Sequence, residues 1–217
     1  MSNTIQAVIW DLDGVIIDSA EEHRLAWFRL AKEEKLPLTD EQFWSTFGWR
    51  NDAIIARLWG PLPAERVKEL ADLKEQYFRE GISKTAAPLP GAIELLSALH
   101  DAGYPQALAS SAPIANIELI SKVLRLDRYL NALVSGETVP HGKPAPDIFL
   151  KAAEQLGVPA AHSLVIEDAV AGVEAAHAGG MRCIAVVGDR DLPGLRAAEL
   201  TVRSLTEVNV ECIRALA

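Results

Sequence analysis

The chain has 217 residues, enough to bury a full hydrophobic core in one domain, or in one domain with a smaller companion. Its hydrophobic content of 49% and charged content of 24% are ordinary for a globular protein. The net charge of −9 argues against duplex nucleic acid or an anionic membrane as the main partner, because both are bound through cationic patches. A small phosphorylated molecule remains compatible, because it needs only local positive charge and a metal ion.

The two cysteines, Cys183 and Cys212, lack metal-ligand spacing, and we expect free thiols rather than a disulfide. The amino terminus shows no basic segment followed by a long apolar one, and no apolar run approaches the roughly 18 residues that span a bilayer. We therefore expect a cytoplasmic protein without a membrane partner, present as a monomer or weak homodimer.

A short apolar run near the amino terminus ends in two carboxylates. Residues 8–15 read Val-Ile-Trp-Asp-Leu-Asp-Gly-Val, the pattern of a buried strand that places charge at a sheet edge, with Gly14 permitting a tight turn. Because alternate residues of a strand share a face, Asp11 and Asp13 are predicted to point the same way. Two like charges so close favour a divalent cation between them. The competing interpretation is an ordinary Asp-Gly turn with Asp13 as a turn former.

A helical segment follows this strand. Ser19 and Glu22 match a capping box, which marks the start of a helix. Asn51 is predicted to cap a later helix, so that Arg50 stands beside free backbone N–H groups that suit an anion. Helices are predicted over residues 20–35, about 51–60 and 64–80, with a stiff linker at 85–91. We therefore predict a small helical cap domain over residues 16–86.

The pattern then changes to alternating helices and strands. Strands are predicted over residues 106–109, 131–134, 163–166 and 182–187 and near 201, and helices over 91–102, from 113, up to 156, over 169–178 and from 205. Apolar strands that alternate with helices favour a parallel sheet covered on both faces. The predicted fold class is α/β, a doubly wound parallel sheet in a core domain of residues 1–15 and 87–217, with the α-helical cap domain inserted.

Polar side chains gather where the predicted strands end. In such sheets the ligand site lies beyond the carboxyl ends of the strands. Five polar residues come at the ends of three strands and a lysine lies in the loop after another: Asp11, Asp13, Ser110, Glu167, Asp168 and Lys143. We expect these side chains to form one site.

The residue types fit the hydrolysis of a phosphate monoester. Asp11 is the candidate nucleophile, and Asp13 the candidate acid and base for the leaving oxygen and the attacking water. Oxygen ligands suit Mg²⁺, and Asp11, Glu167, Asp168 and the backbone carbonyl of Asp13 would supply them. Lys143 and the Ser110 hydroxyl would hold the phosphoryl oxygens.

Four motifs in this order resemble those of the haloacid dehalogenase-like phosphohydrolases. Residues 11–15 resemble the first motif, Ser110 the second, Lys143-Pro144 the third, and Glu167-Asp168 with Gly172 the fourth. The resemblance covers essentially the whole chain. It implies a Rossmann-like core, a helical cap over residues 16–86 that closes over the substrate, and a Mg²⁺-dependent mechanism with an aspartyl-phosphate. The dehalogenases of the family lack the second aspartate, so Asp13 implies phosphate ester chemistry.

Within the family the chain is similar to the group of β-phosphoglucomutase and the sugar-phosphate phosphatases. The similarity rests on Asp18 and on residues 23–27, 107–111 and 142–147. It implies substrate-binding roles for four residues, namely His23, Arg50, Lys74 and Ser111. Gly48 and an arginine match the mutase's cap substrate loop, whereas Phe47 and Trp49 depart from it.

Simpler interpretations of two cap residues remain open. His23 lies on an apolar helix face and is equally well explained as a packed core histidine. Lys74 interrupts an apolar stripe and is equally well explained by a side chain that extends along its own helix to water.

We expect a Mg²⁺-dependent phosphatase of the haloacid dehalogenase superfamily, acting on a small phosphorylated metabolite, a sugar phosphate. The first alternative is a β-phosphoglucomutase that uses the same residues and returns the phosphoryl group to the sugar. The second is a non-catalytic protein that binds a phosphorylated metabolite.

Overall fold

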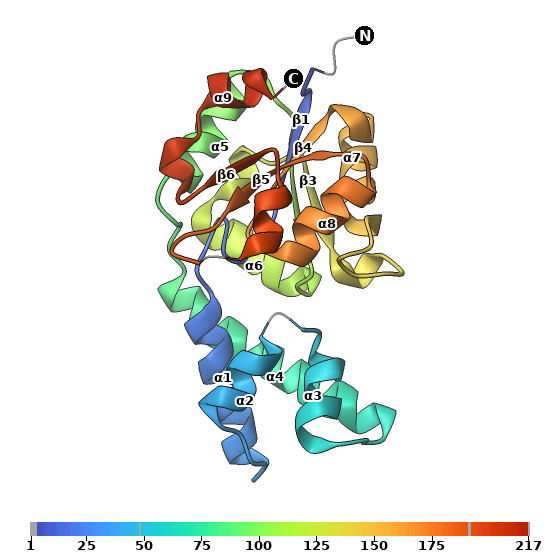
Figure 1. The fold of residues 1–217 in the computed structure, drawn as a ribbon. Helices are drawn as coiled ribbons and strands as arrows, with labels where there is room; N and C mark the ends of the chain where they lie inside the picture. The colour runs from blue at the N-terminus through green and yellow to red at the C-terminus, as the bar shows by residue number, and fades with distance from the viewer. Residues whose placement is uncertain (1–3, 48, 191, 217) are drawn as a thin grey trace. The chain divides into compact units, whose positions relative to one another are not determined.

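The computed structural model describes residues 4–47, 49–190 and 192–216, and Gly48 of the compared cap loop lies outside them. The chain divides into two compact units (Figure 1): the core unit, Met1–Asp18 with Ala87–Ala217, and the cap unit, Ser19–Ala86. The first boundary therefore follows Asp18 rather than residue 15. The reason is that Ile16 and Ile17 are fully buried in the core unit, where the Ile16 carbonyl accepts a hydrogen bond of 2.8 Å from the Leu89 N–H.

Within the described residues, the core unit contains a six-stranded sheet with the order β3-β2-β1-β4-β5-β6, in which every neighbouring pair is parallel. The strands are β1 (Ala7–Trp10), β2 (Gln106–Ser110), β3 (Ala132–Ser135), β4 (Ser163–Glu167), β5 (Arg182–Val186) and β6 (Leu200–Val202). The predicted doubly wound α/β fold is confirmed.

Helices cover the sheet. The α-helices of the core unit are α5 (Ala92–Asp101), α6 (Ile114–Leu124), α7 (Asp147–Leu156), α8 (Val170–Ala178) and α9 (Val210–Ala215). Short 3-10 helices lie at Leu126–Arg128, Gly136–Thr138, Ala160–His162, Pro193–Ala197 and Leu205–Glu207. Side chains of α7 and α8, such as Phe149 and Val173, pack in one buried cluster with Ile9, Ala107 and Val165 of the strands. The intervening strand residues face the other side of the sheet.

Strand β1 lies at the centre of the sheet, between β2 and β4, and all four of its residues are buried. This explains its unbroken apolar run. The indole N–H of Trp10 donates to Gln106 Oε1 at 2.9 Å, and Gln106 Nε2 donates to the carbonyl of Leu96 in α5 at 2.9 Å. The buried polar groups next to the central strand are thus satisfied, and they hold α5 against this face of the sheet.

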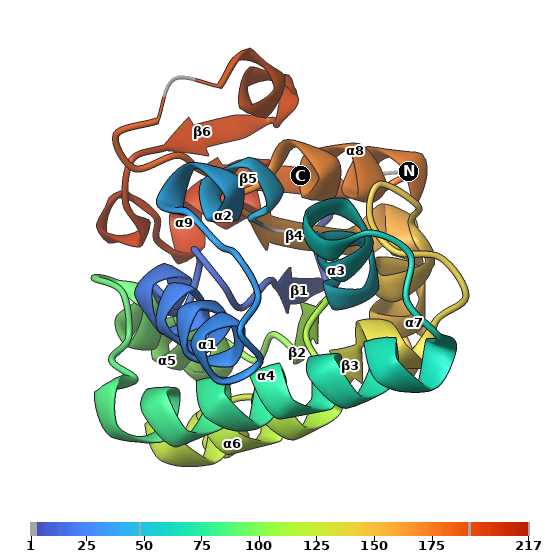
Figure 2. The same cartoon turned by 90° about the horizontal axis from the view of Figure 1, so that it is seen from below.

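The cap unit is made of four helices within its described residues: α1 (Ala20–Glu33), α2 (Asp40–Thr46), α3 (Asn51–Trp59) and α4 (Ala64–Thr85). Helix α1 packs along α4 (Figure 2), and α3 also contacts α4. The apolar stripes meet in a small core that includes Trp27, Leu30, Leu70 and Phe78, each of which is at most 2% exposed.

Two helix caps differ from the prediction. Ser19 stands at the N-cap of α1, but its side chain makes no capping hydrogen bond, and the capping box of the cap unit lies instead at Thr39 and Gln42. The N-cap of α3 is Arg50, whereas Asn51 is its first helical residue and donates its side-chain amide to Glu75 Oε1 at 2.7 Å. Asn51 therefore links α3 to α4 instead of capping α3.

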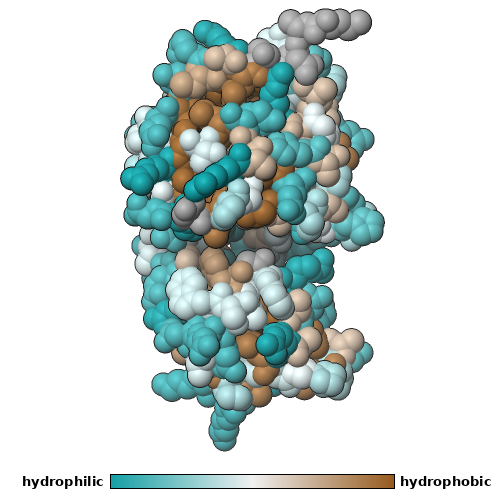
Figure 3. All heavy atoms as spheres, viewed as in Figure 1, coloured by the Kyte–Doolittle hydropathy of each residue, from teal (hydrophilic) through white to brown (hydrophobic). Residues whose placement is uncertain are grey.

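The surface is consistent with the composition. On the face shown in Figure 3, hydrophilic side chains are spread over both units. Both cysteines are free thiols, as predicted. Among the residues that the structure describes, none of the helices combines the length and the apolar character of a membrane span.

Candidate active site

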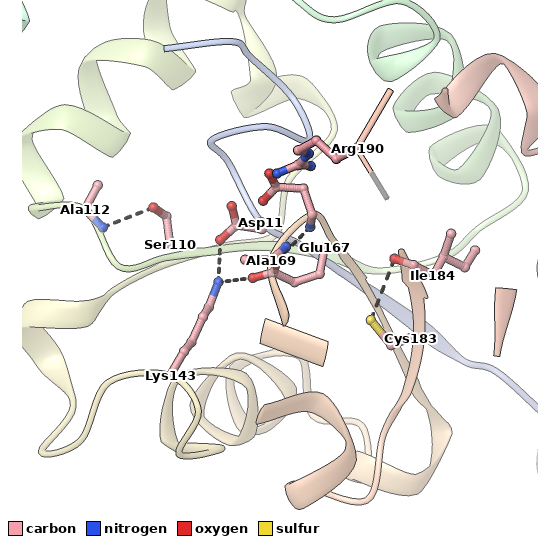
Figure 4. A network of polar contacts seen from close by, with 10 residues as sticks. Asp11, Ser110, Ala112, Lys143, Glu167, Ala169, Cys183, Ile184 and Arg190 are labelled. Carbon is pink, nitrogen blue, oxygen red and sulfur yellow. Dashed lines mark hydrogen bonds and ion pairs between the residues drawn. The ribbon is translucent and has the colours of Figure 1, made fainter. Parts of the chain in front are cut away.

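Asp11 stands at the centre of the candidate site, at the carboxyl end of β1. Its backbone N–H donates to the carbonyl of Ile166 at 2.9 Å, so the pairing of β1 with β4 continues one residue past the strand. Its carboxylate is buried, and its Oδ1 lies 2.5 Å from Lys143 Nζ (Figure 4). The same ammonium group lies 2.6 Å from Glu167 Oε1. A lysine 132 residues away in sequence thus connects the ends of two adjacent strands.

Glu167 is held at both oxygens. Its Oε2 accepts the backbone N–H groups of Asp168 and Ala169, each at 2.6 Å, while its Oε1 binds Lys143. These charge-assisted hydrogen bonds fix the carboxylate at the turn that leads into α8. Lys143 is followed by a cis peptide bond to Pro144, and its side chain is only 10% exposed. The position of the ammonium group is therefore set by buried carboxylates rather than by solvent.

Burial raises the pKa of Asp11 well above its ordinary value. Lys143 opposes this rise, whereas the nearby charges of Glu167, Asp168 and Asp13 add to it. Burial also lowers the pKa of Lys143, but Asp11 and Glu167 raise it by more, so the lysine remains charged. The three other carboxylates predicted from the strand ends therefore lie within electrostatic reach of Asp11, and one cation lies between Asp11 and Glu167.

Two glycines make room for these carboxylates. Gly14 has φ +80°, and a Cβ on it would lie 2.1 Å from Asp168 Oδ2. A Cβ on Gly172, in the first turn of α8, would lie 1.9 Å from Glu167 Oε1. A Cβ at either position would force the neighbouring carboxylate to move, so both glycines allow the close approach of the acidic side chains.

Gly172→Ala is expected to destabilise the protein by about 1–3 kcal/mol and to reduce turnover, because the new methyl group displaces Glu167 and with it Lys143. Gly81→Ala is the matched control, since Gly81 is also helical and its Cβ would meet only Glu22 Cγ, at 3.8 Å. That variant is expected to gain about 0.5–1 kcal/mol. The melting temperatures of the two variants test this prediction. Equal changes in melting temperature would show that the close approach of Glu167 to Gly172 does not affect stability.

The loop after β2 forms another side of the site. Ser110 is buried, and its Oγ accepts the backbone N–H of Ala112 at 3.1 Å (Figure 4). Ser135 Oγ donates to the carbonyl of Ala112 at 2.7 Å, and a Cβ on Gly136 would lie 2.9 Å from the Ser111 carbonyl oxygen. The loop of Ser110 and Ser111 is therefore packed against the loop that follows β3.

The donor set can be tested against a hard divalent cation. Among residues 4–47, 49–190 and 192–216, no three His, Cys, Asp or Glu side chains already surround a common point. Mg²⁺ does not require this, because it is commonly held by one or two carboxylates together with water and substrate phosphate. The buried Asp11 carboxylate and the half-buried Asp168 carboxylate lie within electrostatic reach of each other, and the turn that carries the Asp13 carbonyl closes over Asp168 at Gly14. The residues fit Mg²⁺.

Arg190 is a charged neighbour of the site that the sequence analysis did not identify. It follows β5, and its Nη2 lies 3.0 Å from Asp168 Oδ2. Burial and Glu167 raise the pKa of Asp168 to about 6, although Arg190 opposes the rise. The rule that ligand sites lie beyond the strand ends would have found this arginine if it had also been applied to β5.

The cap residues form a separate buried cluster in their own unit. Lys74 is 2% exposed, and its Nζ lies 2.8 Å from His23 Nδ1 and 2.8 Å from Glu75 Oε1. His23 stacks on Phe78 with 4.0 Å between ring centroids, and burial together with Lys74 lowers its pKa well below the ordinary value. Lys74 therefore does not extend to water, and His23 is neutral. Arg50 is apart from this cluster, with a side chain 69% exposed and paired with Asp52 at 3.4 Å.

Glu75 should make the stability of the cap unit depend on pH. Burial raises its pKa, but Lys74 and Asn51 lower it by more, to about 2. Because this pKa lies below the unfolded value, the stabilisation is complete above about pH 4.5 and is lost as the pH falls towards 2. Glu75→Gln is expected to cost about 3 kcal/mol at pH 7 and progressively less below pH 4.5.

Denaturant unfolding followed by tryptophan fluorescence checks this prediction, because four of the five tryptophans lie in the cap unit. Glu69→Gln, at an exposed position of the same helix, is the control and should lose little at any pH. A constant deficit of Glu75→Gln from pH 7 to pH 3 would contradict the argument.

Comparison with known proteins places this site in a family. Residues 5–180 match the haloacid dehalogenase-like hydrolase family. The chain is 33% identical to beta-phosphoglucomutase of Bacillus subtilis (strain 168), covering 96% of the chain and 94% of that protein. It is 32% identical to hexitol phosphatase A of Escherichia coli (strain K12), covering 93% and 92%. It is 37% identical to protein SUPPRESSOR OF QUENCHING 1 of Arabidopsis thaliana over 84% of the chain, which is only 18% of that protein.

The solved structures agree with the sequence relatives. A HAD hydrolase of family IA, variant 3, from Entamoeba histolytica superposes with a TM-score of 0.88 at 27% identity, covering 98% of this chain and 99% of that one. The motif order, the parallel sheet and the family match all lead to the same assignment. The chain belongs to the haloacid dehalogenase-like hydrolases.

Proposed function

We propose that the protein is a Mg²⁺-dependent phosphatase that hydrolyses a small phosphorylated metabolite, a sugar phosphate, through an aspartyl-phosphate on Asp11. The observation that carries this proposal is the buried Asp11 carboxylate at the end of the central strand, in contact with Lys143, which also binds Glu167. A buried carboxylate next to a fixed cation is suited to attack a phosphorus atom whose oxygens are held by the same cation.

In the first step an Asp11 oxygen forms a bond to phosphorus while the bond to the ester oxygen breaks. Asp13 donates a proton to that leaving oxygen. In the second step Asp13 accepts a proton from water, whose oxygen bonds to phosphorus and releases Asp11 with inorganic phosphate. Lys143 and the Ser110 hydroxyl bind the phosphoryl oxygens in both steps.

Asp11, Asp168 and the backbone carbonyl of Asp13 would hold the Mg²⁺, and Glu167 would complete the acidic set. When bound, the ion neutralises the charge that gathers on the phosphoryl group. Both oxygens of Glu167 already accept hydrogen bonds, so we assign it mainly to the orientation of Lys143 and of the turn before α8. Without a divalent ion, repulsion between Asp11 and the phosphate would oppose the attack.

Substrate recognition is proposed to involve Ser111 in the core unit and His23, Arg50 and Lys74 in the cap unit. Ser111 follows the phosphate-holding Ser110. His23 and Lys74 are linked to each other by a 2.8 Å contact, so we propose that they act as a pair. Arg50 is the exposed cation of the set and is suited to an anionic or polyhydroxylated group.

The alternative is a phosphosugar mutase, which the identity of 33% with beta-phosphoglucomutase favours. Both reactions use the same residues and differ in whether water or a sugar hydroxyl receives the phosphoryl group. One experiment separates them. The protein is incubated with Mg²⁺ and a panel of about a hundred phosphorylated metabolites while phosphate release is measured. In parallel, β-glucose 1-phosphate is supplied with and without a bisphosphate activator while glucose 6-phosphate is measured.

Phosphate release from a sugar phosphate without mutase product supports the proposal. Formation of glucose 6-phosphate faster than phosphate release would replace it with the mutase. Binding of a phosphorylated metabolite without any turnover would replace it with a non-catalytic binding protein. Light scattering after size-exclusion chromatography tests the expected monomer or weak homodimer.

A further inference from the structure

Arg190 is anchored beside the candidate site in an unusual way. Its Nε donates to the carbonyl of Val187 at 3.2 Å, and its Nη2 donates to the carbonyl of Val186, also at 3.2 Å. The same Nη2 lies 3.0 Å from Asp168 Oδ2. Although the side chain is 46% exposed, backbone groups at the carboxyl end of β5 hold its guanidinium in place. A guanidinium surrounded by solvent alone is not held by two carbonyls and a carboxylate together.

Arg190 follows β5 and Asp168 follows β4, and these two strands are neighbours in the sheet. Strand β5 pairs with β4 in a register that places Ala185 next to Glu167, so the residues after the two strands leave the sheet side by side. Asp168 Oδ2 therefore lies next to Arg190 Nη2 and also next to Gly14, where the missing Cβ makes room for it. One oxygen of the carboxylate is thus confined by two segments, which limits how the carboxylate can rotate.

We infer that Arg190 is a positioning residue, which holds one oxygen of Asp168 so that the other faces a divalent cation shared with Asp11. This inference rests on the proposed Mg²⁺-dependent function. Carboxylates that bind metals are generally oriented by outer hydrogen bonds, and the loss of such a partner costs about 10- to 100-fold in metal affinity. The planar guanidinium can bind two carbonyls and a carboxylate at once, which an ammonium group on a flexible stem does not reproduce.

The opposite effect of Arg190 is also physically possible, and the two effects differ in sign. A positive charge close to a metal site repels the incoming cation, so its removal would strengthen metal binding. If orientation dominates, its removal weakens binding. The affinity for Mg²⁺ alone, without substrate, therefore distinguishes the two effects.

The experiment is calorimetric titration of Mg²⁺ into the whole protein and into Arg190→Gln and Arg190→Lys. Arg128→Gln is the matched control, because Arg128 Nε also donates to the carbonyl three residues earlier at 3.2 Å, but it follows α6 and carries no contact with Asp168. We expect Mg²⁺ affinity about tenfold weaker in both Arg190 variants and unchanged in Arg128→Gln. Melting temperatures without metal should be alike in all four proteins.

Unchanged or tighter Mg²⁺ binding by Arg190→Gln would overturn the inference. Full affinity in Arg190→Lys would also overturn it, because charge alone would then be sufficient. If the unaltered protein hydrolyses a phosphate ester with Mg²⁺ while the variants bind the ion normally, only the role of Arg190 fails. If the unaltered protein neither binds Mg²⁺ nor hydrolyses any ester, the proposed function fails together with the inference.

Discussion

Asp11→Asn is expected to lower the rate of phosphate release by at least about 10⁴-fold. The amide cannot form the acyl phosphate, so no covalent path remains. The protein should still fold, because the amide oxygen can accept a hydrogen bond from Lys143, which also keeps its contact with Glu167. Single-turnover phosphate release with the best substrate of the panel measures the loss.

The control for this variant is Asp101→Asn. Asp101 is an exposed carboxylate at the last residue of α5. It precedes β2 and therefore lies towards the amino end of that strand, whereas the candidate site lies at the carboxyl ends of the strands. This change should leave both turnover and melting temperature as they were. Normal phosphate release by Asp11→Asn would show that the nucleophile has been assigned to the wrong residue, whatever substrate the protein uses.

Lys143→Met is expected to have the largest effect on stability. Its removal leaves Asp11 and Glu167 buried without their common cation, and breaking a buried ion pair in this way costs about 3–5 kcal/mol. Turnover should also fall, by about 10²- to 10³-fold, because the phosphoryl oxygens lose a fixed positive charge.

The loss of stability in Lys143→Met should depend on pH, and the direction of that dependence can be derived. The folded-state pKa of Asp11 is raised by burial, so its ionised form opposes folding more strongly as the pH rises above the unfolded value. Once the lysine is absent, the stability deficit should therefore shrink as the pH falls from 7 towards 4. Urea unfolding at several pH values measures it, with Lys122→Met, at an exposed position of α6, as the control. A deficit no larger than that of Lys122→Met would be incompatible with a buried ion pair at this position.

The strand ends illustrate what was predictable from the sequence. The run of residues 8–15 contains both the buried strand and the position of Asp11, because the twofold period of a strand and the glycine turn are local properties. The same holds for Glu167, which ends an apolar run. Once the alternation of strands and helices is recognised as a parallel sheet, it follows from the fold class that the carboxyl ends of the strands lie on the same side of the sheet. The Mg²⁺ ion, the cap residues' roles and the substrate class stay predictions.

The errors also have physical causes. Ser19 is the N-cap of α1 as predicted, but the capping box predicted with it does not form. Asn51 is predicted to cap α3 because its type favours that position, yet its amide binds Glu75 on another helix. Such a contact depends on how α3 packs against α4. Local preference contributes about 1 kcal/mol, which a tertiary hydrogen bond to a partly buried carboxylate can match.

The sequence by itself determined the order of the strands and helices, the acidic strand ends and the family, because periodicity and short motifs are properties of neighbouring residues. The tertiary structure alone decided which polar side chains meet: Lys143 with both Asp11 and Glu167, Lys74 with His23, and Arg190 with Asp168. Long charged side chains can reach many partners, and the choice among them depends on strand register and helix packing. Those are set by the burial of the whole core and not by any local segment.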